Sequence, residues 1–123
     1  MRFFTGDLLD PFEGRTPPGP IRVLASNPPY VSPADRHRLA PEVALHEPSL
    51  ALFAPERGLG VIRRLITGAA GVLPEGALLA LEIGEDLGSE VQKLLRSGGA
   101  WREARIERDL AGRDRYALAI KAR

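Results

Sequence analysis

The chain has 123 residues and a formal net charge of +1, with 44% hydrophobic and 27% charged residues. This length suits one domain, and this composition predicts a folded core rather than a disordered chain. The near-zero charge argues against a basic face for nucleic acid, and the absence of cysteine excludes disulfides and thiolate metal sites.

The N-terminal part of the chain, up to about residue 55, is rich in proline: ten of the 11 prolines lie at or before Pro55. Residues 2–4 are a candidate short strand, and residues 11–20 have the composition of a surface loop. The apolar run 21–26 predicts a buried strand, which ends because two prolines follow it at Pro28 and Pro29.

The remaining part, residues 56–123, has regular periodicity, and we expect it to complete one partial domain with residues 1–55. A helix is predicted over 56–73, because apolar residues recur there at intervals of three and four. A second buried strand is predicted over 77–83. Ser89 and Gln92 have the spacing of a capping box at the start of a further helix.

Two strands, 101–107 and 115–121, close the chain. The linker between them is too short for a crossover helix, so this pair is predicted to be antiparallel. Strand, helix, strand, helix and an antiparallel pair together predict an α/β sheet with helices on both faces.

No stretch of the chain has the length of a membrane span or of the apolar core of a signal peptide, so we expect a soluble cytoplasmic protein. The two histidines, His37 and His46, do not have metal-ligand spacing, and no metal site is expected.

The sharpest motif is Asn27-Pro28-Pro29-Tyr30, at the carboxyl end of the 21–26 strand, where open α/β sheets bind ligands. An amide nitrogen is hard to methylate because its lone pair is delocalised. A site can help by accepting hydrogen bonds from both of its N–H groups. Asn27 offers a side-chain oxygen, and Pro28 offers a rigid carbonyl. Tyr30 can wall a pocket around a planar group. The alternative is a plain proline turn.

Other segments, in the same order along the chain, make the motif more specific. They are Phe4-Thr5-Gly6-Asp7-Leu8-Leu9, Glu42-Val43, His46-Glu47-Pro48, Ala51-Leu52-Phe53, Gly58-Leu59, Ile62-Arg63, Leu81-Glu82-Ile83-Gly84 and Asp109 to Arg115. Together with the motif, they resemble the C-terminal portion of the HemK-type methyltransferases, which act on glutamine N5 in peptide chain release factors.

The resemblance implies a partial Rossmann-like fold, S-adenosylmethionine as methyl donor, and the glutamine of a Gly-Gly-Gln motif as substrate, with a role in translation termination. It implies that Asn27 and Pro28 orient the glutamine amide, with Pro29 and Tyr30 lining its pocket. Asp7, Leu8 and Asn27 match positions near the cofactor. For Asp7 and Leu8 the alternative is a simple Gly-Asp turn.

The family's first strands and glycine-rich cofactor loop have no counterpart in this sequence. The segment from Glu82 to Gly88 is a candidate replacement for this loop, because it follows a strand and opens a helix. Glu85 and Asp86 argue against it, since they would repel the cofactor's carboxylate. We therefore expect weak cofactor binding, or none, by the chain alone, with little activity. We also expect an unpaired strand edge that self-associates, swaps a segment or docks with a missing half. The competing functions are an adenine-N6 nucleic-acid methyltransferase fragment and a non-catalytic remnant or interaction module.

Overall fold

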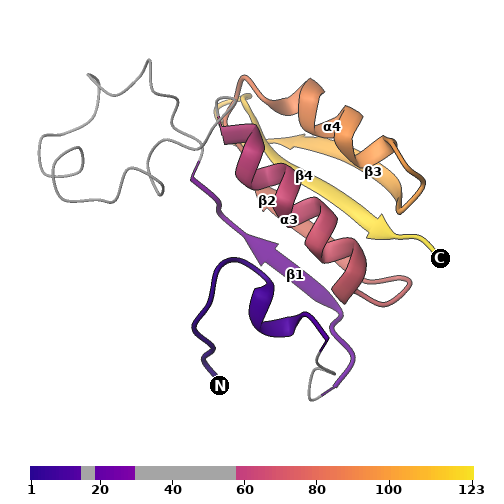
Figure 1. The fold of residues 1–123 in the computed structure, drawn as a ribbon. Coiled ribbons are helices and arrows are strands. Elements are labelled where there is room, and N and C mark those ends of the chain that lie inside the picture. Colours follow the sequence, from indigo (N-terminus) through magenta and orange to yellow (C-terminus); the bar gives the residue numbers. More distant parts are fainter. Residues whose placement is uncertain (15–18, 30–57) are drawn as a thin grey trace, which may run out of the picture.

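The computed structural model describes residues 1–14, 19–29 and 58–123, so Tyr30 and the motif segments between 42 and 57 lie outside the described residues. Figure 1 shows the elements, whose bounds are η1 (Asp10–Phe12), β1 (Val23–Ser26), α3 (Leu59–Val72), β2 (Leu78–Glu82), α4 (Gly88–Arg96), β3 (Trp101–Arg108) and β4 (Asp114–Lys121). The prediction of a strand over residues 2–4 is wrong. This segment is irregular, and the Phe4 ring lies edge-on to that of Phe12, with 5.2 Å between the ring centroids.

The four strands form one sheet in the order β1-β2-β4-β3. β1 runs parallel to β2, whereas β4 is antiparallel to both of its neighbours. The predicted antiparallel pair at the end of the chain is therefore confirmed. Because β1 stands at one edge, its only described neighbour is β2.

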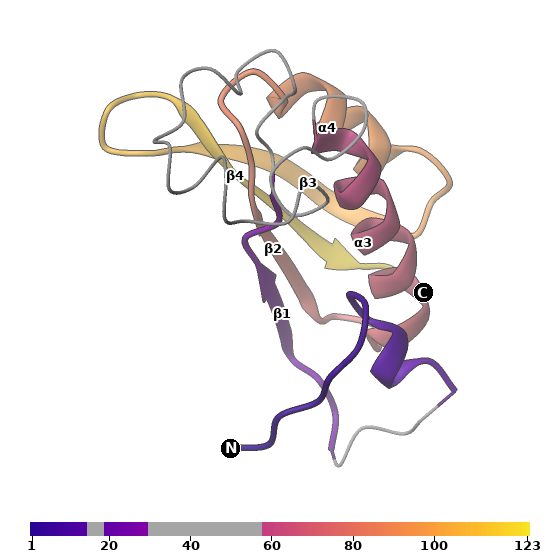
Figure 2. The same cartoon turned by 60° about the vertical axis from the view of Figure 1, so that its left-hand side comes forward.

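Both described α-helices, α3 and α4, cover the same face of the sheet (Figures 1 and 2). The predicted spacing of apolar residues on α3 places its buried side chains toward the core, and these are Leu59, Val61, Ile62, Leu65, Ile66 and Ala69. From the sheet, Leu79, Leu81, Ala117 and Ala119 face them, each at most 1% exposed. The expected α/β architecture is confirmed, but a second helical layer is not among the described residues. No described helix is long and apolar enough to cross a membrane.

The start of α4 differs from the prediction. The helix is preceded by Leu87 rather than capped by Ser89, and no side chain caps it. Gln92 instead donates its side-chain amide to the carbonyl of Ala104 on β3, at 3.3 Å. Tertiary contact with the sheet has replaced the local capping box that the sequence suggested.

The opposite face of the sheet carries no described helix, and its side chains come from alternate strand positions. Leu79 and Leu81 point to the helices, so Leu78, Ala80 and Glu82 point to this open face. By the strand register, Val23 and Ala25 of β1 lie beside Leu78 and Ala80. The open face is thus apolar in its middle and polar near the carboxyl end of β2.

Candidate functional site

The motif asparagine lies at the rim where the parallel strands end. Ser26 pairs with Leu81, so Asn27 follows directly at the carboxyl edge shared by β1 and β2. Asn27 is exposed and lines a cavity of about 570 Å³ on the open face of the sheet. Its amide is therefore available to a ligand at the edge where open α/β sheets bind them.

The two prolines that follow Asn27 fix the chain as it leaves the strand. Pro28 is buried and Pro29 is partly buried. Neither ring carries an N–H, and both restrict the backbone, so the Pro28 carbonyl is held in a defined direction. Nothing is described of Tyr30, and its predicted place in the pocket stays a prediction.

The cavity beside Asn27 also involves three residues that the sequence did not single out as functional. They are Glu82, Glu107 and Tyr116. Only the strand register brings them together, because Tyr116 pairs with Glu82 and with Glu107 across adjacent strands. An outward position at the carboxyl edge was the available signal in the sequence for Glu82.

Two of the three predicted cofactor residues, Asp7 and Leu8, lie next to α3. The Asp7 carboxylate accepts a hydrogen bond from Arg64 at 2.6 Å, and both side chains are about half exposed. This hydrogen bond raises the pKa of the Arg64 guanidinium. Asp7 thus joins the N-terminal segment to α3, an interaction that the sequence did not suggest.

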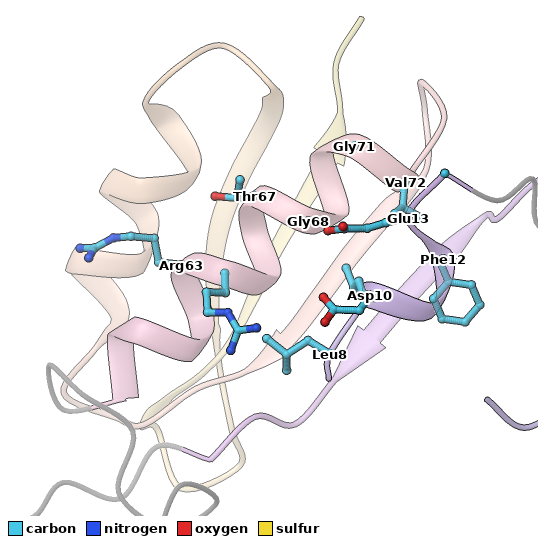
Figure 3. A pocket seen from close by; sticks show the side chains of 12 residues that line it. Leu8, Asp10, Phe12, Glu13, Arg63, Thr67, Gly68, Gly71 and Val72 are labelled. Carbon is cyan, nitrogen blue, oxygen red and sulfur yellow. The ribbon is translucent and has the colours of Figure 1, made fainter. Parts of the chain in front are cut away.

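Leu8 lines a cavity of about 830 Å³ between η1 and α3 (Figure 3). Charged side chains of Asp10 and Arg63 also line it. Leu8 has a φ of 52°, which is uncommon for a residue with a side chain. A second, apolar cavity of about 370 Å³ runs from Leu8 to Ser26 along β1. The structure therefore links Leu8 to the β1 edge but does not place it in the cavity of Asn27.

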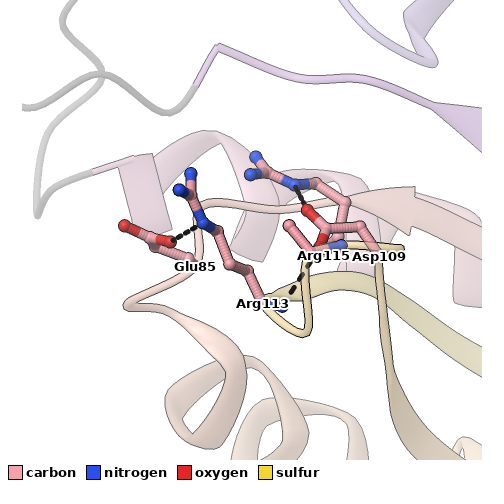
Figure 4. A network of polar contacts seen from close by, with 5 residues as sticks. Glu85, Asp109, Arg113 and Arg115 are labelled. Atoms are coloured by element: carbon pink, nitrogen blue, oxygen red, sulfur yellow. Dashed lines mark hydrogen bonds and ion pairs between the residues drawn. The ribbon is translucent and has the colours of Figure 1, made fainter.

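The loop between β3 and β4 lies at the same edge and is held by one carboxylate (Figure 4). Asp109 Oδ1 accepts the backbone N–H groups of Ala111 at 2.9 Å and Arg113 at 3.0 Å. Its Oδ2 accepts from Arg115 Nε at 3.3 Å. The bond from the Arg113 backbone, with those from Arg115 and Ala111, holds the pKa of Asp109 below its usual range. Arg113 also pairs with Glu85, at 3.4 Å.

Asp109→Asn is expected to reduce stability near pH 7 and to make it less dependent on acid pH. The folded-state pKa of Asp109 is lowered, so its contribution is present above the unfolded-state pKa of about 3.9 and is lost as pH falls through the folded value. Urea unfolding of the wild-type protein and the variant at pH 7 and pH 3 should show a difference in the free energy of unfolding that is smaller at pH 3. A difference of equal size at both pH values would contradict this account.

The turn from Ile83 to Gly88, within the Glu82 to Gly88 segment considered above, is packed rather than open. Ile83 and Leu87 are fully buried. A Cβ on Gly88 would collide with the carboxylate of Asp114. This turn therefore packs against the β3–β4 hairpin.

Within the described parts of the chain, no group of three or more His, Cys, Asp or Glu residues is placed to hold a metal ion.

Comparison with known proteins gives one consistent result. A release factor glutamine methyltransferase of Moorella thermoacetica is 44% identical over 94% of this chain and 39% of that protein. The enzyme of the same name from Deinococcus radiodurans is 39% identical over 99% of this chain and 41% of that protein. The chain thus spans about two fifths of the length of these curated relatives. No family model matches the sequence.

A solved structure agrees with these relatives. The protein-(glutamine-N5) methyltransferase (release factor-specific) of Alicyclobacillus acidocaldarius has a TM-score of 0.53 and 25% identity, covering 85% of this chain and 50% of that one. The fold is therefore that of a partial Rossmann-like methyltransferase domain. Within that class the resemblance to the HemK-type glutamine-N5 methyltransferases is confirmed, since the chain is similar along nearly its whole length to a portion of these enzymes.

Proposed function

We propose that this chain takes part in methyl transfer from S-adenosylmethionine to a glutamine side-chain nitrogen, in the Gly-Gly-Gln motif of peptide chain release factors. The observation that carries the proposal is the position of Asn27. It is exposed, at the carboxyl edge of a parallel strand pair, and it lines a cavity of about 570 Å³. The similarity to enzymes of that name supports the choice of substrate.

In this proposal, Asn27 and Pro28 orient the amide that is methylated. The side-chain oxygen of Asn27 accepts one N–H of the glutamine, and the carbonyl of Pro28 accepts the other. Both acceptors stand on a rigid backbone, so their reorganisation costs little when the transition state forms. Pro29 and Tyr30 complete the walls of the pocket. No metal takes part.

S-adenosylmethionine would supply an electrophilic methyl group. Asp7, Leu8 and Asn27 are the proposed contacts for it. The described residues fit this group in part, because Leu8 offers an apolar wall in two cavities. The Asp7 carboxylate is engaged with Arg64, and a cofactor would have to share or displace that partner. We therefore expect weak binding of the cofactor by this chain alone.

A chimeric enzyme tests the proposed function. The segment of the Moorella thermoacetica relative that aligns with this chain is replaced by residues 1–123, and methyl transfer is measured with a release factor and with adenine-containing DNA. Transfer to the release factor glutamine supports the proposal. Transfer to adenine would support the nucleic-acid alternative, and a folded chimera without either activity would favour a non-catalytic role.

The edge of β1 is the proposed site of strand pairing with a second copy of the chain. The N–H of Leu78 donates to the carbonyl of Arg22, at 2.9 Å, so alternate residues from Arg22 onward face β2. The backbone groups of Val23 and Ala25 therefore point outward. Val23 is 56% exposed, and the strand has no charged side chain to block pairing.

For the isolated chain we expect self-association that increases with concentration in light scattering. Ala25→Pro should reduce it, because proline removes an outward N–H without breaking the β1–β2 bonds. A proline placed elsewhere is not a suitable control where it breaks the fold. Ser97→Pro, for example, would remove the hydrogen bond that the Ser97 N–H donates to the carbonyl of Lys93. Leu110→Ala is suitable, because that side chain is fully exposed far from β1 in the sequence. A strict monomer at high concentration would overturn this proposal.

A further inference from the structure

Three polar side chains follow one another across the sheet at its carboxyl edge. Asn27 comes directly after the Ser26–Leu81 pair, Glu82 directly follows Leu81, and Tyr116 is the strand partner of Glu82. All three line the cavity of about 570 Å³ on the open face. A ligand seated against Asn27 therefore meets Glu82 as its next neighbour, with Tyr116 beyond it.

The Glu82 carboxylate is not engaged elsewhere in the described part of the chain. It is partly buried, and no described residue forms a hydrogen bond or ion pair with it. Glu107 lines the same cavity but differs, because its carboxylate accepts a hydrogen bond from Arg105 Nε at 2.8 Å. Glu82 is thus an available acceptor beside Asn27, whereas Glu107 is already occupied.

We propose that Glu82 positions the substrate by sharing with Asn27 one N–H of the primary carboxamide in a three-centre hydrogen bond, while the Pro28 carbonyl accepts the other N–H. This rests on the proposed function and adds a specificity residue to it. A carboxylate only accepts hydrogen bonds, so it favours an –NH₂ group and disfavours a second carboxylate. Glutamine is thereby distinguished from glutamate. Tyr116, 41% exposed, offers an aromatic wall on the far side of Glu82.

The charge of this cavity favours a peptide over a nucleic acid. Glu82 and Glu107 both contribute to its lining, and among the described lining residues none is basic. Phosphate groups close to the Glu82 carboxylate would be repelled, whereas an uncharged carboxamide would not. A neutral glutamine side chain is therefore the ligand that this lining suits.

The test uses the full chain and a capped Gly-Gly-Gln peptide as probe, with a capped Gly-Gly-Glu peptide and adenosine monophosphate for comparison. Amide chemical shifts are followed by NMR during titration. The wild-type chain should respond to the glutamine peptide at Asn27, Glu82 and Tyr116, and more weakly to the other two probes. Equal response to the glutamate peptide, or stronger response to the nucleotide, would overturn the inference.

Two matched variants complete the test. Glu82→Gln should weaken binding of the glutamine peptide about tenfold, because the charge-assisted hydrogen bond is replaced by a neutral one. Glu107→Gln removes a charge from the same cavity and should change binding by less than about twofold, because that carboxylate serves Arg105. Equal effects of the two variants would also reject the role of Glu82.

The outcomes separate this inference from the proposed function. A wild-type chain that does not respond to the glutamine peptide overturns the role of Glu82, while methyl transfer by the chimera is judged independently. A chimera that methylates the release factor equally well with Glu82 or Gln at this position leaves the proposed function intact and rejects the inference. A chimera that fails with every variant rejects the function itself.

Discussion

Asn27→Ala, introduced into the chimeric enzyme, is expected to lower methyl transfer to the release factor at least about a hundredfold, as loss of a preorganised polar group in an active site commonly does. The side chain is exposed and has no hydrogen-bond partner within the described residues. Its loss should therefore leave folding nearly unchanged. The measurement is the initial rate of methyl incorporation at saturating cofactor.

Glu75→Ala is the control for this variant. Glu75 is exposed in the turn before β2, at the opposite end of that strand from the edge that carries Asn27, and it lines neither the cavity at Asn27 nor the cavities at Leu8. If the reaction takes place at Asn27, the glutamate variant should retain its rate within about threefold, since surface changes away from a site have small effects. Retained activity in Asn27→Ala would reject the role of Asn27.

The sequence predicted those elements whose pattern is local. Leu59, Ile62, Leu65, Ile66 and Ala69 recur at helical intervals, and the structure buries them all on α3. The apolar runs that predicted two buried strands formed β1 and β2, each within a few residues of the expected bounds. The burial of β1 was predicted wrongly, because β1 lies at an edge of the sheet and its Val23 is 56% exposed. The five-residue linker between β3 and β4, residues 109–113, could only join antiparallel strands. These features depend on near neighbours, which a sequence displays.

Features that depend on distant partners were not predictable. The sequence did not predict that one face of the sheet carries no described helix. This follows from the position of α3 and α4 on the same side of the sheet. Whether Glu82 lines a cavity depends on which strand lies beside β2, and the sequence does not display that. The register alone places Tyr116 next to Glu82. A bulge between Arg102 and Arg105 leaves Glu103 at a φ of 55°, and nothing in its local sequence indicates this.

The candidate site shows the same division. Asn27 and Pro28 were identified from four consecutive residues and a preceding apolar run. The structure places Asn27 exposed at a cavity and Pro28 buried next to it in the chain, and the roles of both residues stay predictions. Asp7 was expected near a cofactor, and its ion pair with Arg64 could not be inferred because the two residues are 57 positions apart.

Leu79→Ala should cause the largest loss of stability, about 2–5 kcal/mol in the free energy of unfolding. Leu79 is 0% exposed on β2, between β1 and β4, and its side chain faces the helices. Truncation leaves a cavity that the neighbouring strands cannot close, because β2 is held by backbone hydrogen bonds on both sides. Small domains have only about 5–15 kcal/mol in total, so a partly unfolded population is expected.

Urea denaturation followed by circular dichroism measures this effect, with Leu110→Ala as the matched control. Leu110 is fully exposed in the β3–β4 loop, so the same change of side chain there removes no buried surface and should shift stability by less than about 0.5 kcal/mol. Equal midpoints for the two variants would mean that Leu79 is not in the core. β2 also holds Glu82 beside Asn27. Local unfolding of this strand should therefore disrupt the cavity at the carboxyl edge before the chain unfolds completely.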